Sequence, residues 1–251
     1  GAEVDPTDSK TGFNERYVSK VNLTNLAENT QYYYRVCAGG SISKTYKFKT
    51  TSASQTNINF LFGTDIHAAG GGYTPTRPNS MINAIRANVR NLNLLVLTGD
   101  QIDRGGYEAH WQSYYSGMQI YDDITVAAIP GNHEYYHTSG SEYVSPLYFN
   151  QFYNNPQNGP ESRINSSYYF KYGNILFIML DIIDKKHVIE HKEWIKTTKS
   201  GDKSDLSFMP TESLWQRINS ESDGCRGQLC PHKDKCFVMK VKKEAASSQI
   251  L

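Results

Sequence analysis

The sequence predicts an α/β protein in which an incomplete, layered α+β core follows a small N-terminal β-sandwich-like piece and precedes an irregular or helical C-terminal tail. Apolar runs of strand length alternate with segments of helical spacing between residues 53 and 183. Residues 1–52 show only the apolar–polar alternation of strands, and residues 184–251 begin with a lysine-rich stretch. The 251 residues include 18 tyrosines and 19 glycines, which favours sheets and turns over helical bundles.

The overall charge gives no reason to expect a polyanionic partner for the whole chain. The formal net charge is +1, and charged residues make up 20% of the sequence. The longest apolar runs, "LNLLVL" and "NILFIML", are far too short to cross a bilayer. We therefore expect no transmembrane segment and predict that both runs are buried strands.

Residues 1–52 are predicted to contain an antiparallel hairpin. The segments "TQYYYRVCAGG" and "SKTYKFKTT" alternate in the strand manner on either side of a Gly-Gly turn. This string resembles the last strands of a fibronectin type III module, and in particular the small domain that precedes the catalytic domain in purple-acid-phosphatase-like proteins. The alternative is an unrelated β-hairpin. Since the first strands of such a module are missing, we expect a partial domain of marginal stability.

Residues 53–183 are predicted to form the layered core. Three buried strands are expected in "NINFLFGTDIH", "LNLLVLTGD" and "DITVAAIPGNH". The segment "RPNSMINAIRANVRNLN" is predicted to be an amphipathic helix with Met81, Ile82, Ile85 and Val89 on one side, and "EAHWQSYYSGM" a second helix. The stretch "SSYYFKYGNILFIMLDI" is predicted to be a β-hairpin.

Polar side chains that can bind metal ions follow each of the three strands. Asp65 and His67 follow the first, Asp100 the second, and Asn132 and His133 the third. Ligands of layered α/β proteins gather at the carboxyl ends of the strands, so these groups are expected to converge. A carboxylate such as Asp100 can bridge two cations, and two cations about 3.5–4 Å apart stabilise the attacking and leaving oxygens of a displacement. Mixed nitrogen and oxygen ligands favour Zn, Fe or Mn.

Three motifs in this order resemble those of the calcineurin-like metallophosphoesterases, which cleave phosphate esters at a two-metal centre. Each motif lies at the end of a predicted strand. The motifs are D-x-H (Asp65, His67), G-D-x-x-D-R (Gly99, Asp100, Asp103, Arg104) and G-N-H-E (Gly131 to Glu134). The resemblance predicts that residues 53–183 are the N-terminal half of such a domain.

The resemblance also implies a role for each matching residue. Asp65, His67 and Asp100 would hold the first metal ion. Asp100 would bridge to the second ion, which Asn132 also binds. His133 would contact the phosphate and assist the leaving group as an acid or charge stabiliser. Arg104 would orient His133 or the phosphate, although a structural ion pair is an equally good interpretation of Arg104.

Two departures from the family pattern stand out. The tyrosine that gives purple acid phosphatases their colour is replaced by Asp103, so the site resembles that of the non-purple branch, although the N-terminal hairpin resembles the purple one. After Asp181 there is no histidine before a proline-rich turn and no G-H-x-H motif, so the second metal site would lack histidine ligands. His187 and His191 have helical i, i+4 spacing and could in principle chelate a metal ion, but the sequence around them carries none of the expected turns. His110 and His137 are expected to be surface or packing residues.

Residues 184–251 are predicted to be a separate tail that joins the core near residues 181–190. Cys225, Cys230 and Cys236 form a C-x4-C-x5-C pattern among basic residues. This pattern resembles the iron–sulfur region of DinG-type DNA helicases, which implies a 4Fe–4S cluster with one ligand missing. No G-x-x-x-x-G-K-[ST] motif is present, so the nucleotide site of such a helicase is absent from these residues.

The main functional hypothesis is therefore a metal-dependent phosphoesterase acting on small phosphate mono- or diesters, with impaired turnover. One alternative is an iron–sulfur fragment of an ATP-dependent DNA helicase, in which case nucleic acid becomes a partner. Another is a non-catalytic β-rich binding domain. The front half suggests an extracellular or cell-envelope location, whereas a cysteine cluster of this kind suggests the reducing cytoplasm.

Overall fold

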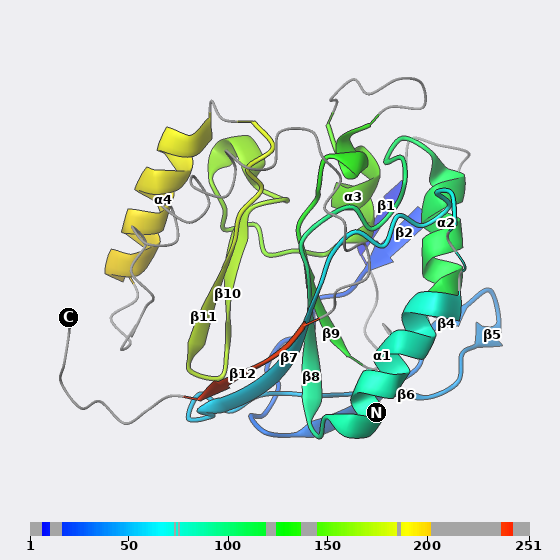
Figure 1. Ribbon diagram of the computed structural model, residues 1–251. Helices are drawn as coiled ribbons and strands as arrows, with labels where there is room; N and C mark the ends of the chain where they lie inside the picture. The colour runs from blue at the N-terminus through cyan, green and yellow to red at the C-terminus, as the bar shows by residue number, and fades with distance from the viewer. Residues whose placement is uncertain are drawn as a thin grey trace.

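The structure is a computed structural model that describes residues 7–10, 17–72, 74, 76–118, 124–136, 145–184, 187–201 and 237–242. A four-stranded sheet lies at its centre, in the order β12-β7-β8-β9 (Figure 1). The parallel strands are β7 (Asn57–Gly63), β8 (Leu92–Leu97) and β9 (Thr125–Ala128). β12 (Phe237–Lys242) pairs with β7 in the antiparallel direction. The three predicted strands are thus confirmed.

One face of the sheet packs against helices. These are α1 (Thr76–Asn88), α2 (Glu108–Gly117) and the short α3 (Leu147–Phe152), and both predicted helices are confirmed. Leu61, Leu95 and Leu97 from the strands share a buried cluster with Ile82 of α1 and Trp111 of α2. Ile85 and Val89 pack against this cluster, as the helical spacing predicts.

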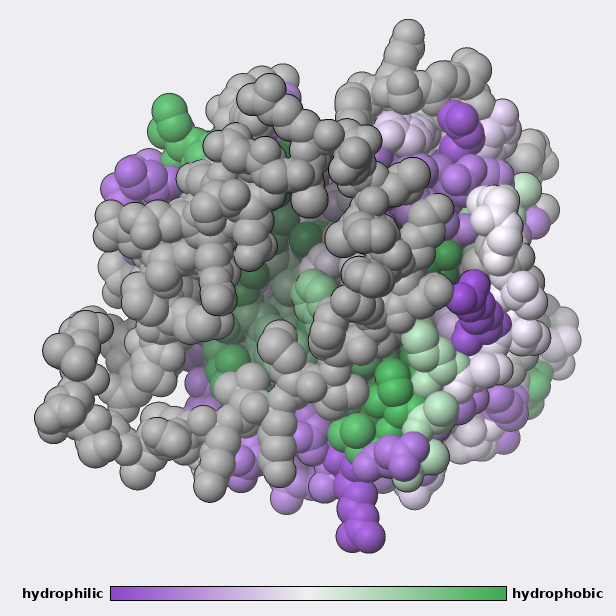
Figure 2. All heavy atoms as spheres, viewed as in Figure 1, coloured by the Kyte–Doolittle hydropathy of each residue, from purple (hydrophilic) through white to green (hydrophobic). Residues whose placement is uncertain are grey.

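The other face of the sheet packs against a β-hairpin. β10 (Tyr168–Tyr172) and β11 (Ile175–Met179) form the hairpin predicted for this stretch. Phe60, Leu94 and Val96 alternate with the helix-facing leucines and join the hairpin residues in a second buried cluster. β7 and β8 are therefore apolar on both faces, which is why their sequences are nearly continuous apolar runs. Apolar residues gather between the hairpin and the central sheet on the face shown in Figure 2.

The hairpin carries a fourth helix on its outer side, α4 (Val188–Gly201) (Figure 1). Trp194 of α4 donates its indole N–H to the carbonyl of Asn158 at 2.8 Å and lies beside the Tyr169 ring. α4 begins after residue 183, where the sequence places the end of the core. The predicted domain limits stay a prediction, but α4 packs on the core and β12 extends its sheet.

The N-terminal piece consists of antiparallel strand pairs. The strands are β1 (Thr7–Lys10), β2 (Tyr17–Lys20), β3 (Gln31–Tyr34), β4 (Cys37–Ala38), β5 (Ser41–Ile42) and β6 (Tyr46–Lys49). β1 pairs with β2, β3 with β6, and β4 with β5 across the predicted Gly39-Gly40 turn. The Lys20 ammonium group attaches this piece to α3 by donating to the carbonyls of Asn150 and Tyr153 at 3.1 and 3.0 Å.

Two predictions for the C-terminal half concern residues that the structure does not describe. Cys225, Cys230 and Cys236 lie outside the described residues, as does His137. The predicted iron–sulfur cluster and the helicase resemblance therefore stay predictions. Within the described ranges, no helix combines the length and the apolar character that a membrane span needs.

Candidate metal centre

The loops that follow β7 and β8 are joined by backbone hydrogen bonds beyond the ends of the strands. The N–H groups of Asp65, His67 and Ala68 donate to the carbonyls of Gly99, Asp100 and Gln101, at 3.2, 2.9 and 2.9 Å. The loop after β9 continues into a single 3-10 turn, η2 (His133–Tyr135). The three loops therefore meet at the carboxyl edge of the sheet, where the sequence predicts the site.

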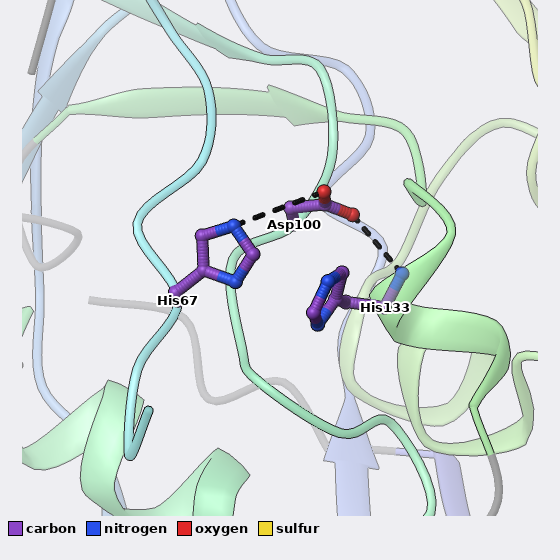
Figure 3. A group of neighbouring side chains, drawn as sticks. All are labelled: His67, Asp100 and His133. Carbon is purple, nitrogen blue, oxygen red and sulfur yellow. Dashed lines mark hydrogen bonds and ion pairs between the residues drawn. The ribbon is translucent and has the colours of Figure 1, made fainter. Parts of the chain in front are cut away.

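His67, Asp100 and His133 converge at this edge. One ligating atom from each lies within 4.8 Å of the others (Figure 3), and no other such cluster of three or more occurs among the described residues. The Asp100 carboxylate accepts the backbone N–H of His133 at 3.0 Å, and its other oxygen is 3.9 Å from His67 Nε2. The two imidazole rings meet edge to face, with centroids 4.3 Å apart. Two imidazoles and a carboxylate suit Zn, Fe or Mn.

Asp65 lies beside this cluster. Its Oδ1 is 3.5 Å from His67 Nε2, and its Oδ2 accepts the Thr64 hydroxyl at 2.7 Å. The interaction with His67 lowers the pKa of Asp65, and the same interaction raises the pKa of His67. The Asp65 side chain is 45% exposed, so it is the member of the predicted set that solvent reaches most easily.

Three of the predicted ligands have a left-handed backbone. Asp65, His67 and Asp100 have φ angles of 56°, 49° and 53°. For residues other than glycine this backbone region is unfavourable by about 1–2 kcal/mol per residue. Residues held in such strained conformations gather at functional sites. The backbone hydrogen bonds between the loops hold these three residues in this unfavourable conformation, which sets the direction of their side chains.

The glycines before the ligands serve a close approach of two loops. A Cβ atom at Gly99 would collide with the backbone of Gly131, and a Cβ atom at Gly131 would collide with the Asp100 carboxylate. Gly99 also has a φ of 108°. The sequence predicts glycine for a sharp turn here, and the structure adds that the second and third loops touch at these two positions.

The ring of His133 is held by Asp103. His133 Nδ1 is 2.5 Å from the Asp103 carbonyl oxygen, which can only accept a hydrogen bond, so Nδ1 carries a proton. In the neutral ring, Nε2 is then the nitrogen with the free lone pair.

The predicted role of Arg104 in orienting His133 stays a prediction. The backbone N–H of Arg104 donates to His110 Nδ1 at 3.1 Å, which gives His110 the packing role predicted for it.

Asn132 stands at the start of η2 and points its amide at a neighbour. Its Nδ2 donates to the Tyr136 hydroxyl at 2.7 Å, which leaves the amide oxygen as the atom suited to a metal ion. The Tyr136 ring in turn lies against His133, with centroids 4.6 Å apart. The predicted metal role of Asn132 stays a prediction, with the orientation of its amide defined by Tyr136.

Glu134 is a residue whose role the sequence analysis did not identify. It is 2% exposed, and its carboxylate accepts four backbone N–H groups, from Gly131, Asp100, Gln101 and Ile102 at 2.6, 2.8, 2.8 and 3.3 Å. Burial raises the pKa of Glu134 to about 7, with the Asp100 charge adding to the rise and the N–H donors opposing it. Glu134 thus fastens the second loop to the third. Its place in the G-N-H-E motif was the available signal.

The histidine pair in α4 belongs to a different network. His191 is buried, and its Nε2 is 2.8 Å from the Ser167 hydroxyl while its Nδ1 is 2.7 Å from the His187 carbonyl. His187 lies 3.4 Å from Glu190 through its own Nδ1. Neither histidine belongs to a metal-binding cluster among the described residues.

Comparisons with known proteins agree with this geometry. Residues 58–236 match the family model of the calcineurin-like phosphoesterases, and residues 2–50 match that of the purple acid phosphatase N-terminal domain. The fold is similar to that of a purple acid phosphatase from yellow lupin (Lupinus luteus) seeds, with a TM-score of 0.55 and 18% identity. That match covers 72% of this chain and 35% of the lupin chain. No curated protein matches. The chain belongs to the calcineurin-like phosphoesterase family.

Proposed function

We propose that this chain is a metal-dependent phosphoesterase that hydrolyses small phosphate mono- or diesters. The observation that carries the proposal is the convergence of His67, Asp100 and His133 at the sheet edge. We assign Asp65, His67 and Asp100 to a first metal ion, and Asp100 and Asn132 to a second. Bound ions of this kind supply a Lewis acid for the phosphoryl oxygens and lower the pKa of a bound water.

The chain's own residues would contribute positioning and proton handling. Since Nδ1 of His133 donates to the Asp103 carbonyl, Nε2 is the ring atom that can hold or accept a proton at the substrate. We assign Nε2 to the contact with the phosphate and the leaving oxygen. Glu134 does not touch the reacting atoms in this proposal. It keeps Asp100 and His133 in register through the backbone.

We further propose that these 251 residues, by themselves, hold the second ion weakly and turn over slowly. The residues assigned to that ion are one shared carboxylate and one amide, because no G-H-x-H motif is present in the sequence. Loss of one ion removes charge stabilisation from one side of the displacement.

The cysteine-tail hypothesis keeps an independent test, which is the visible absorbance of an iron–sulfur cluster after anaerobic reconstitution, compared with a Cys230→Ser variant.

The proposal is tested by metal content and hydrolysis together. The purified chain is loaded with Zn²⁺ or Mn²⁺, dialysed, and assayed by elemental analysis and with p-nitrophenyl phosphate and its diester. We expect about one tightly held ion per chain and slow hydrolysis, both lost in Asp100→Ala. Glu193→Gln, on the exposed side of α4, is the control and should keep both. Metal binding that survives Asp100→Ala would refute the assignment.

A further inference from the structure

A cavity of about 500 Å³ lies next to the η2 turn. Its walls come from Tyr135 of η2, Asn150 of α3, the segment from residue 161 to residue 166, and Asp184 after β11. None of the residues assigned to metal ions lines it. Its volume is in the range of small-molecule sites, and Tyr135 lies only two residues after His133. The η2 turn therefore contributes one residue to the cavity and one to the candidate metal centre.

Most of the lining residues carry polar side chains, and Pro146, Ile164 and Ile183 add apolar surface. Three serines and two asparagines contribute, together with Tyr135, Arg163, Glu161 and Asp184. Two of the lining residues, Arg163 and Asn150, each carry a buried polar atom without a hydrogen-bond partner, Nε and Oδ1 respectively. Most buried polar groups in proteins have a partner, so these two side chains keep hydrogen-bonding capacity that the described residues do not use.

Arg163 lies next to the buried carboxylate of Asp181. Its Nε is 3.7 Å from Asp181 Oδ2, and the Asp181 side chain is fully buried. The same carboxylate accepts a short hydrogen bond from the Tyr135 hydroxyl. The guanidinium group lies over the Tyr135 ring, 5.7 Å from its centroid. The charge of Arg163 is thus balanced inside the protein by Asp181, while the residue also lines the cavity.

The charges of the lining argue against a second anionic group. Arg163 is balanced by Asp181, whereas Glu161 and Asp184 add two negative charges to the walls. A further phosphate or carboxylate would face like charges here. A neutral group rich in hydroxyls meets no such repulsion. It can donate to the carboxylates and asparagine oxygens and accept from Arg163 and the serines.

We propose that this cavity binds a neutral, hydroxyl-rich leaving group, so that the substrate is the phosphate ester of a sugar or polyol. The proposal rests on the proposed function, because it assigns the organic part of the same substrate. η2 carries both a cavity residue, Tyr135, and the residue assigned to the phosphate contact, His133. Sugar recognition in the cavity and phosphate contact at the metal centre would then be coupled through one helical turn.

The first experiment measures binding without metal ions or turnover. D-glucitol is titrated into the full chain in excess chelator and followed by saturation-transfer NMR. We expect saturable binding that Asn150→Leu weakens by about fivefold, which corresponds to the loss of one hydrogen bond. Since Asn150 Oδ1 has no partner, this variant should remain folded, and circular dichroism checks that it does. Glu193→Gln, outside the cavity, should bind like the wild type.

The second experiment compares the hydrolysis of glucose 6-phosphate and n-hexyl phosphate by the metal-loaded chain. Asn150→Leu should raise KM for the sugar phosphate severalfold and leave KM for hexyl phosphate unchanged. No binding of glucitol, or an equal effect of Asn150→Leu on both esters, overturns the polyol assignment even if hydrolysis is observed. Saturable glucitol binding that Asn150→Leu weakens supports the assignment even if no ester is cleaved, and that lack of cleavage counts against the proposed function alone.

Discussion

At the scale of single residues, the candidate centre depends on two glycines whose loops touch. A Cβ atom at Gly131 would collide with Asp100 Oδ1, so Gly131→Ala has to displace the carboxylate that we assign to both metal ions. We expect a loss of about 1–3 kcal/mol in the free energy of unfolding and a weaker affinity for Zn²⁺. Denaturant unfolding and zinc titration measure the two effects.

The matched control for that variant is Gly71→Ala. A Cβ atom at Gly71 would meet nothing within 4 Å, and the φ angle of Gly71 lies outside the left-handed region. This substitution should leave stability and zinc affinity near the wild-type values. Equal behaviour of the two variants would show that the contact between the second and third loops does not position Asp100.

Glu134 makes the metal-free chain sensitive to pH. Burial raises the pKa of Glu134 to about 7 from the ordinary 4.5, so the folded state favours the neutral form of this carboxyl group. The contribution of Glu134 to stability is complete below about pH 4.5 and is lost as the pH rises through 7, because the unfolded chain ionises first. We expect the free energy of unfolding in chelator to fall over this window and to fall less in Glu134→Gln. Urea unfolding from pH 4.5 to 8 checks this, and equal slopes for both proteins would contradict it.

Single residues also show where prediction from the sequence ends. The position of Asp65, His67 and Asp100 at one edge of the sheet was predictable, because these residues follow apolar strands and parallel strands end at one edge. The burial of Glu134 was not predictable in the same way. A glutamate in a loop is ordinarily exposed, and here it is buried where the second loop and the start of its own loop both direct N–H groups at it. Such convergence is a property of the assembled loops.

At the scale of elements, a lysine contributes to the attachment of the N-terminal strands. Lys20 of β2 donates to two carbonyls at the C-terminal end of α3, where the last carbonyls of a helix lack intrahelical partners. Lys20→Met should release this contact and leave the central sheet unchanged. We expect faster amide hydrogen exchange and faster proteolysis within residues 17–49, by a factor of several.

Lys47 provides the comparison for that element. It lies in β6 and is exposed, so Lys47→Met removes a charge of the same kind without a contact to α3. Its exchange rates should match those of the wild type. If both variants loosen residues 17–49 equally, charge rather than the attachment to α3 stabilises the N-terminal piece.

Elements with a long local pattern could be predicted, whereas short elements could not. β7, β8, α1, α2 and the β10–β11 hairpin each carry their own apolar periodicity. α3 has only six residues, nearly all of them large or aromatic, and η2 is a single turn. β12 follows no signal that the sequence analysis used, because its position depends on a partner strand far away in the chain.

At the scale of the whole molecule, the folded state should be linked to metal binding. A ligand that binds only the folded chain adds about 2.7 kcal/mol at a concentration of 100 times its Kd. We expect Zn²⁺ or Mn²⁺ to raise the thermal midpoint of the wild type by several degrees, as measured by circular dichroism, and to leave Asp100→Ala unshifted. A rise of the same size in Asp100→Ala would place the stabilising ion elsewhere.

The pairing of β12 with β7 has a consequence for how the protein is made. Asn57 lies opposite Lys242 in this ladder, so β12 leaves the ribosome long after β7. At roughly 5–20 residues per second, translation needs about 10–40 s to produce the second strand after the first. During that interval β7 exposes unpaired N–H and C=O groups to any neighbouring nascent chain. A chaperone that covers this edge would therefore matter most during translation.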